Sequence, residues 1–302
     1  MSNSTIKDKQ GLTEEQFLEQ YDVSKYDRPS VTVDMLILTI MDEEKENYRK
    51  LPEKKLKLLL IKRGEHPYIG QWALPGGFVG VNESIDAAAI RELKSETNID
   101  NIYMEQLYTW GDPGRDPRTR VISCSYMALV DSTALKIKAG DDAADAAWFE
   151  FKYKIVQEHR TELEKGHQLE RLIKIELVNE LATLTATVKV TETVKNRSTR
   201  YSREIVDSQG IAFDHAVMME YAIERLRNKL EYTDLAFSLV PELFTLTELQ
   251  KVYEVILGKE LLAAAFRRKI ANMVIETEQY TRDAGHRPSQ LFRFNPNWRY
   301  EK

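Results

Sequence analysis

The feature that most constrains the fold is a paired-glycine turn followed by a helix that carries two glutamates. The turn is Leu74-Pro75-Gly76-Gly77, where paired glycines allow a sharp bend and close backbone approach to a ligand. Nearly all residues from 87 to 94 are good helix formers, which predicts a helix at about 84–97. Glu92 and Glu96 are four residues apart and would project from one face of it. Two such carboxylates repel unless a cation lies between them, and Mg²⁺ suits oxygen ligands of this kind.

An isolated pair of glutamates at this spacing is more often an exposed charged helix face, so the surrounding pattern matters. The full pattern is Gly77-x5-Glu83-x7-Arg91-Glu92-Leu93-x-Ser95-Glu96-x-Asn98-Ile99. It resembles the Nudix box and matches seven of its nine fixed positions. The resemblance implies an α/β fold, the Nudix α/β/α sandwich with a mixed sheet. It also implies that Glu92 and Glu96 are the catalytic ligands of Mg²⁺, with Glu83 and Arg91 orienting the helix and the loop.

Two positions depart from the box. Ser95 stands where a second metal-binding glutamate is expected, and Asn98 stands where glycine is expected. A hydroxyl is neutral and a poorer ligand for a hard metal, so Ser95 should weaken the binding of a second or third ion. Mg²⁺ would be weak or absent if the domain is not catalytic. Asn98 is a milder change, because asparagine tolerates the left-handed conformation at a helix end.

Composition limits the class of protein. A chain of 302 residues can hold two domains. The single cysteine, Cys124, excludes an internal disulfide and indicates a cytoplasmic protein with a buried thiol. The chain lacks an apolar run of about 18 residues, so no membrane association is expected. The net charge of −5 gives no whole-chain sign of nucleic-acid binding.

Strand patterns surround the box and continue beyond it. Apolar runs or alternation predict strands at 31–38, 56–62, 102–109, 120–130 and, as a short strand, 147–149. Residues at about 155–210 alternate apolar and polar side chains around Ile175, Val188 and Arg203, which predicts a β-rich antiparallel insertion. A helix is expected to open at 211–215 and to run to about Leu230. We therefore expect a Nudix-like ligand-binding domain at 1–230 and a second domain at 231–302.

The second domain has the pattern of a winged helix-turn-helix. Thr245 and Glu248 form a capping box, and Gly258 ends the helix that they begin. A second helix is expected to start near Glu260 and to bury Leu262 and Phe266. Strands at 274–275 and 291–294 would then form the wing.

Basic residues gather in this segment. Residues 261–299 contain seven arginines and lysines against three acidic residues, although the whole chain is acidic. The candidate DNA-binding residues are Arg267, Arg268, Lys269, Arg287 and Arg293. Such a patch suits contacts with the phosphates of DNA, although an exposed helix face has the same composition.

The combination resembles the Nudix-related transcriptional regulators. In that family a Nudix-like domain senses ADP-ribose or a related nucleotide, and a winged helix binds operator double-stranded DNA as part of a homodimer. The residues expected to bind the ligand are Gly76, Gly77, Trp72, Arg115 and Arg118, and for the last three a structural role is an equal alternative. A ligand-responsive transcriptional regulator is the first hypothesis.

The alternative is an active Mg-dependent Nudix pyrophosphohydrolase of the ADP-ribose pyrophosphatase type. Its general base would come from Asp141, Asp142 or Glu150, among which the sequence does not choose.

Overall fold

The computed structural model describes residues 6–43, 53–98, 102–134, 146–281 and 288–299. Within them, one large sheet has the order β10-β9-β8-β7-β2-β1-β6-β5. Its strands are β1 (Ser30–Glu43), β2 (Glu53–Lys62), β5 (Tyr103–Trp110), β6 (Val121–Asp131), β7 (Ala146–Leu163), β8 (Gly166–Val178), β9 (Thr183–Lys195) and β10 (Ser198–Gln209). The short strands β3 (Trp72–Ala73) and β4 (Gly76–Phe78) pair with β2 and β1. The sheet is mixed, because β1 runs parallel to β6 and antiparallel to β2.

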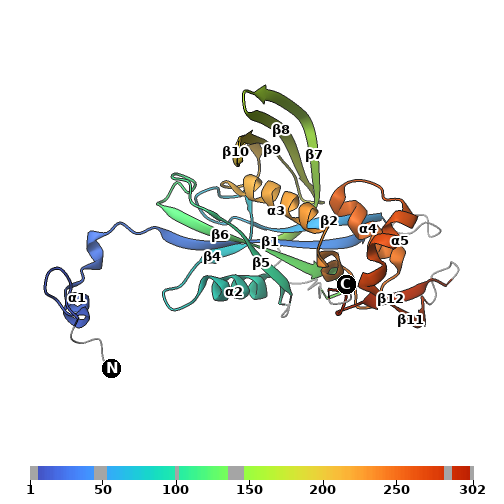
Figure 1. Ribbon diagram of the computed structural model, residues 1–302, viewed down its shortest axis with the longest axis horizontal. Coiled ribbons are helices and arrows are strands. Elements are labelled where there is room, and N and C mark those ends of the chain that lie inside the picture. Colours follow the sequence, from blue (N-terminus) through green and yellow to red (C-terminus); the bar gives the residue numbers. More distant parts are fainter. Residues whose placement is uncertain (1–5, 44–52, 99–101, 135–145, 282–287, 300–302) are drawn as a thin grey trace.

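Helices cover both faces of this sheet (Figure 1). Alternate side chains of β1 point to opposite faces, as the pleat of a strand requires. Val33 and Met35 pack with helix α2 (Ile85–Thr97), whereas Leu36 and Leu38 belong to the core that includes α3 (His215–Lys229). The expected α/β/α sandwich is therefore confirmed.

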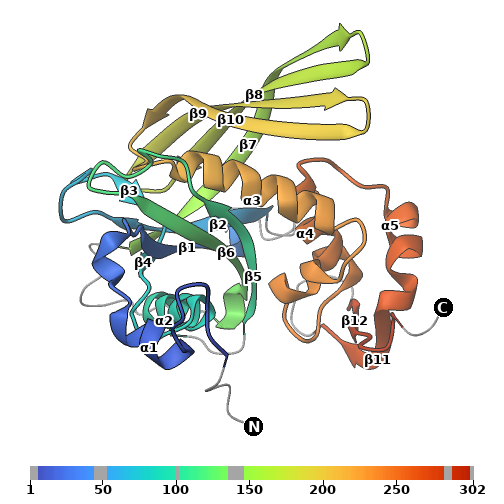
Figure 2. The same cartoon turned by 60° about the vertical axis from the view of Figure 1, so that its left-hand side comes forward.

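The segment at 155–210 extends the central sheet. The β-rich antiparallel insertion is confirmed, since β7 to β10 pair in sequence as three hairpins. The expectation of a short strand at 147–149 was wrong: β7 is 18 residues long and continues beside β8 to the hairpin tip. Figure 2 shows α3 lying along one face of these strands. Ile175 and Val188 are fully buried on that core.

The chain after α3 forms the winged helix. It contains η3 (Leu235–Leu239), α4 (Leu246–Leu257), α5 (Ala263–Ile270), η4 (Ala271–Met273) and the antiparallel hairpin of β11 (Val274–Tyr280) and β12 (Gln290–Phe294). The capping box of Thr245 and Glu248 is present, and Gly258 ends α4 in the left-handed conformation. The prediction that Leu262 is buried was wrong, because Leu262 precedes α5 and is 81% exposed.

The winged helix and the sheet share one continuous apolar core. Ile256 of α4 and Phe266 of α5 belong to the same buried cluster as Leu58 of β2 and Leu226 of α3. The two parts therefore pack through direct apolar contact, α4 against β2 and η3 against β6, and α3 reaches α4 alongside them (Figure 2).

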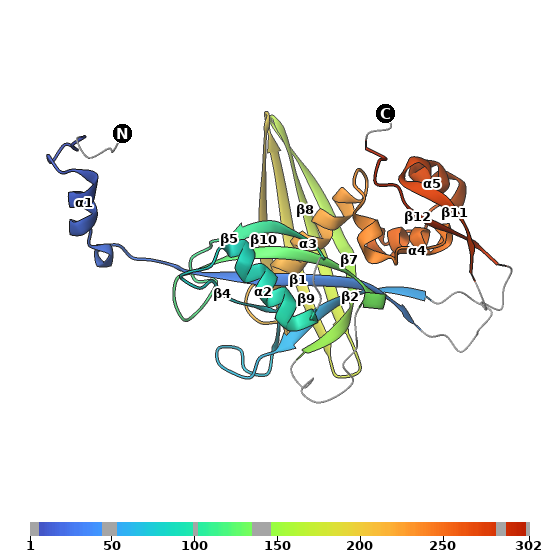
Figure 3. The same cartoon turned by 90° about the horizontal axis from the view of Figure 1, so that it is seen from below.

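The N-terminal arm, residues 6–29, extends away from this body (Figure 3). Its helix α1 (Glu14–Gln20) begins with a capping box of Thr13 and Gln16. The arm exposes apolar side chains at Ile6, Phe17, Leu18, Tyr21, Val23 and Tyr26. In the described part of the chain, no helix is both long and apolar enough to cross a membrane. Cys124 is a buried free thiol of the sheet core, as expected.

Candidate functional site

The paired glycines are required by the packing of β4. A Cβ atom on Gly77 would lie 2.3 Å from Glu92 Oε1, and one on Gly76 would lie 2.2 Å from the carbonyl oxygen of Val33. Helix α2 then begins at its N-cap, Ser84, whose hydroxyl accepts a hydrogen bond from the Ala87 N–H. These contacts bring the backbone of the turn directly against the Glu92 carboxylate.

Arg91 and Glu83 orient the turn and the helix. The Arg91 guanidinium donates to both Glu83 oxygens at 2.8 and 3.2 Å, to the Phe78 carbonyl at 3.2 Å and to Glu92 Oε1 at 2.5 Å. Glu83 also accepts from the Gly80 N–H at 2.7 Å. The hydrogen bonds from Arg91 and Gly80 lower the pKa of Glu83 to about 2. This network fits the orienting role expected of the two residues.

The remaining box residues show what Ser95 changes. Burial and the charge of Glu92 raise the pKa of Glu96, as expected of two neighbouring carboxylates. The Ser95 hydroxyl donates to the Glu92 carbonyl at 2.8 Å, so it satisfies the helix backbone. Asn98 caps the helix with φ +54°, the left-handed conformation that its side chain tolerates. Glu92 Oε1 is engaged by Arg91, and Ser95 adds no carboxylate beside those of Glu92 and Glu96.

A cavity of about 170 Å³ opens beside the glycine turn. It is lined by Thr32, Asp34, Ile61, Arg63, Ala73, Leu74, Gly76, Gly77, Phe78, Arg115, Asp116, Arg118, Val121, Phe213 and His215. Four of the predicted ligand residues, Gly76, Gly77, Arg115 and Arg118, meet here. Trp72 does not line it, because its indole is 5% exposed and packs edge-on against Phe149 in the core.

Three arginines line the cavity, and their partners differ. Arg115 makes two hydrogen bonds to Asp214, at 2.8 and 2.9 Å, and lies 3.7 Å from Asp34. Arg118 is paired with Asp116 at 2.7 and 3.0 Å. Arg63 donates instead to carbonyl oxygens, at 2.6 Å to Pro67 for the shorter bond. Among the described residues, Arg63 is therefore a cavity cation without a carboxylate partner.

Aromatic rings complete the mouth of the cavity. Phe213 has φ +53°, an uncommon conformation for a bulky residue that points to a functional constraint. The Arg63 guanidinium lies 4.9 Å from its ring centroid. Arg118 lies 5.5 Å from the Phe78 ring and 5.9 Å from the Phe213 ring. The rings and guanidinium planes form a surface on which a flat ligand group can stack.

His215 joins α3 to the glycine turn. Its Nδ1 accepts a hydrogen bond from the Leu74 N–H at 2.9 Å, and its Nε2 faces Asp34 at 3.6 Å. Burial lowers the pKa of His215, so the ring is neutral with its proton on Nε2. His215 is thus a buried histidine whose ring nitrogens both face partners. Helix α3 begins at His215, within the predicted opening at 211–215 and after the bend at Phe213.

Sequence reasoning missed Asp34, Arg63, Phe213 and the position of His215. Arg63 left one signal, as a base directly after an apolar strand. Asp34 and the neighbouring pair Phe213 and His215 reach the cavity from two other parts of the chain, so no local pattern predicted that they meet there. The possible bases Asp141 and Asp142 lie outside the described residues. Glu150 forms an ion pair with Lys55 at 3.1 Å and does not line the cavity.

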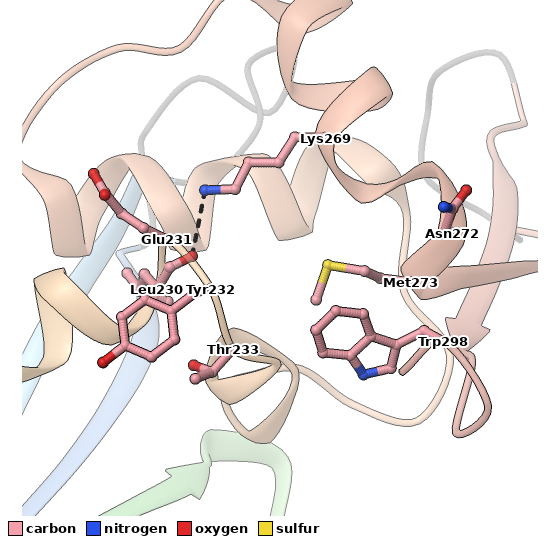
Figure 4. Close-up of a pocket in the computed structure, with 8 residues that line it drawn as sticks. All are labelled: Leu230, Glu231, Tyr232, Thr233, Lys269, Asn272, Met273 and Trp298. Atoms are coloured by element: carbon pink, nitrogen blue, oxygen red, sulfur yellow. Dashed lines mark hydrogen bonds between the residues drawn. The ribbon is translucent and has the colours of Figure 1, made fainter. Parts of the chain in front are cut away.

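The predicted DNA-binding side chains are placed differently from one another. Arg267, Arg268 and Arg293 are exposed. Lys269 points back to the end of α3, where its Nζ donates to the Leu230 carbonyl at 3.3 Å (Figure 4). Arg287 lies outside the described residues.

Helix α3 connects the cavity with the winged helix. At its start, Asp214 holds Arg115. Near its end, Arg227 donates to the Ile256 carbonyl of α4 at 2.7 Å, and Lys269 of α5 donates to Leu230. A helix of 15 residues is about 22 Å long. The start of α3 therefore contacts the cavity, and its end contacts the winged helix.

Two family models match the chain. Residues 37–171 match the NUDIX domain, and residues 236–294 match the NrtR DNA-binding winged helix domain. The chain is 34% identical to the ADPR responsive transcriptional repressor NtrR of Acinetobacter baylyi, over 93% of this chain and 88% of that protein. It is 38% identical to the ADP-ribose pyrophosphatase of Methanocaldococcus jannaschii, over 44% of this chain and 70% of that protein.

A solved structure has the same architecture. The crystal structure of Shewanella oneidensis NrtR complexed with a 27mer DNA is similar with a TM-score of 0.60 and 27% identity, over 89% of this chain and 94% of that chain. Together with the two domain matches and the full-length similarity to the Acinetobacter repressor, this shows that the chain belongs to the family of Nudix-related transcriptional regulators with an NrtR winged helix.

Proposed function

We propose that this protein is a transcriptional regulator whose Nudix-like domain binds ADP-ribose and whose winged helix binds operator DNA. The observation that carries the proposal is the position of α3. Its first residue, His215, lies in the cavity, and its last turn contacts α4 and α5 through Arg227 and Leu230. A ligand that binds the two arrangements of this helix unequally shifts the balance between DNA-competent and incompetent forms.

The cavity chemistry fits a nucleoside diphosphate linked to a sugar. A diphosphate is bound well by a guanidinium group, and that of Arg63 is not bound to a carboxylate. The ring of Phe213 offers a stacking surface for a base. The volume of about 170 Å³ is small against the roughly 300–1,000 Å³ of ligand pockets. Arg118, which covers Phe78 and Phe213, must therefore move when the ligand enters.

One Mg²⁺ ion fits the box better than a cluster does. Glu92 and Glu96 provide its carboxylates, and the ion would screen the charge of a bound diphosphate. Ser95 supplies no charge, and its hydroxyl is bonded to the Glu92 carbonyl. Weak metal binding and slow turnover follow from this arrangement.

An active pyrophosphohydrolase is the second candidate function. It is favoured by the intact network of Glu83, Arg91 and Glu92 and by the similarity to the Methanocaldococcus enzyme. Incubation with Mg²⁺ and ADP-ribose, followed by measurement of AMP, tests it. Turnover at about 1 per second or faster would make this an ordinary enzyme and not primarily a sensor.

We assign the DNA surface to Arg267 and Arg268 of α5 and to Arg293 of β12, and Arg287 stays a prediction outside the described residues. We place the boundary between the domains after residue 230, at the end of α3. A homodimer on a palindromic operator suits this architecture, and the apolar side chains of the arm at residues 6–29 offer a surface for a second copy to cover. A cytoplasmic location agrees with the free thiol of Cys124.

The decisive experiment removes two charges and measures both activities. Arg267→Ala combined with Arg268→Ala should abolish the gel shift of the protein's own promoter, while calorimetry should show unchanged ADP-ribose binding. Arg200→Ala on β10 is the matched control, since it removes an exposed arginine far from the winged helix. Unchanged operator affinity in the double variant would overturn the DNA assignment.

A further inference from the structure

A second, larger cavity lies on the other side of the Arg115–Asp214 pair from the first. Its volume is about 790 Å³. It is lined by Tyr108, Trp110, Asp112, Pro113, Gly114, Arg115, Tyr201, Ser202, Arg203, Ile205, Asp214, Val217 and Tyr221. These residues come from β5 with the loop after it, from β10 of the insertion, and from α3. The insertion therefore builds one wall, and the proposed ADP-ribose site does not include this space.

Aromatic rings dominate the cavity wall. Tyr108 contacts Trp110 with ring centroids 4.8 Å apart and contacts Tyr221 at 5.4 Å. Trp110 is fixed by the hydrogen bond from its Nε1 to Ser125 at 2.9 Å. Tyr108 and Tyr201 are each about half exposed, at 51% and 53%. The wall is thus a set of ordered rings that solvent reaches.

The charges around these rings disfavour a phosphorylated ligand. Arg115 lies between the carboxylates of Asp214 and Asp34. Arg203, the other lining cation, is bound by two glutamates, Glu220 at 2.6 Å and Glu224 at 2.5 Å. Each guanidinium therefore faces two carboxylates, and Asp112 adds another negative charge to the wall. The local excess of negative charge repels anions and attracts cations.

The rings already hold one cation of the chain itself. The Arg203 guanidinium lies 4.8 Å from the Tyr221 centroid and 5.8 Å from that of Tyr201. Tyrosine and tryptophan faces attract cations through the ring quadrupole, and quaternary ammonium ions are recognised by aromatic cages of this kind. We propose that this cavity is a second ligand site, for a small organic cation whose charge is alkylated or delocalised, of the quaternary ammonium or pyridinium type.

The test compares a cation with its neutral isostere. Choline and 3,3-dimethylbutan-1-ol have the same shape and differ in charge. Calorimetry on the full-length protein should show saturable binding of choline and at least about tenfold weaker binding of the alcohol. Tyr108→Leu, which removes a half-exposed ring, and Asp112→Asn, which removes a charge, should each weaken choline binding by about three- to thirtyfold. Tyr232→Leu, an exposed tyrosine outside the cavity, is the matched control and should change nothing.

Three results would overturn the proposal. Equal affinity for the alcohol would show that the cavity binds apolar groups without regard to charge. Choline binding that is absent, or unaffected by Tyr108→Leu, would show that the rings hold no such ligand. Competition between choline and ADP-ribose would show that the two cavities are one site. A protein that fails to bind ADP-ribose but binds choline as described would leave this inference standing and refute the proposed effector instead.

Discussion

Three adjacent basic residues of α5 should contribute unequally to DNA binding. Arg267, Arg268 and Lys269 are all exposed, but the Lys269 ammonium also donates to the Leu230 carbonyl at 3.3 Å and lies 5.4 Å from the Tyr253 ring. A cation that is engaged within the protein must break those contacts before it reaches a phosphate. We therefore predict that alanine at 267 or 268 weakens the electrostatic part of DNA binding, whereas alanine at 269 does not.

The magnitude follows from counterion release. Each phosphate contact contributes about −0.9 to the slope of log K against log salt for duplex DNA. Between about 50 and 200 mM salt, the loss of one contact should reduce the fall in affinity by about 3.5-fold. Lys269→Ala should leave the slope unchanged and instead lower the free energy of unfolding by about 0.5–1 kcal/mol, because it removes one hydrogen bond and one ring contact.

The assay needs no knowledge of the operator. Fluorescence anisotropy with labelled duplex DNA of arbitrary sequence, measured over a salt series, gives the slope for each variant. Arg200→Ala on β10 controls for the loss of one positive charge from the whole protein. Urea unfolding of the same samples measures the stability.

Either of two results would refute this reasoning. If Lys269→Ala makes the salt dependence less steep by as much as Arg267→Ala does, then the lysine contacts a phosphate. Its hydrogen bond to Leu230 would then be broken in the DNA complex. If neither arginine variant changes the slope, then α5 does not face the duplex.

Three further predictions concern the cavity and the box. Ser95→Glu should raise both Mg²⁺ affinity and release of AMP from ADP-ribose, measured by calorimetry and product analysis; if neither rises, the missing carboxylate does not limit turnover. Arg115→Met should lower the free energy of unfolding in urea by about 3–5 kcal/mol, because it leaves Asp214 uncompensated, and adding Asp214→Asn should recover part of the loss; additive losses would contradict a direct pair. Burial lowers the pKa of His215 below its usual 6.5, so the unfolded state binds more protons just below that pH. Stability should therefore fall as the pH drops below about 6.5, by at most about 1.4 kcal/mol per pH unit, and His215→Gln should flatten this part of the profile relative to the parent protein; superimposable profiles would mean that the histidine does not titrate between the two states.

The sequence alone determined the elements whose stabilising contacts are local. The capping boxes at Thr245 and Thr13 join residues three positions apart, and the left-handed Asn98 and Gly258 end their helices through bonds within one turn. The spacing of Glu92 and Glu96 follows from helical geometry. Such contacts are encoded in a few neighbouring residues, so the box and the helix-turn-helix could be predicted.

Only the tertiary structure decided which distant side chains share a site. Phe213 and His215 meet Arg63 and Asp34 because β3 and the segment just before α3 run side by side, joined by hydrogen bonds between Trp72 and residues 210–212. No local pattern encodes a pairing across 140 residues of chain. Trp72 packs into the core and Lys269 turns to α3 for the same reason. The sequence pattern indicates which face of an element a residue occupies, whereas the neighbour that it contacts depends on how the elements pack.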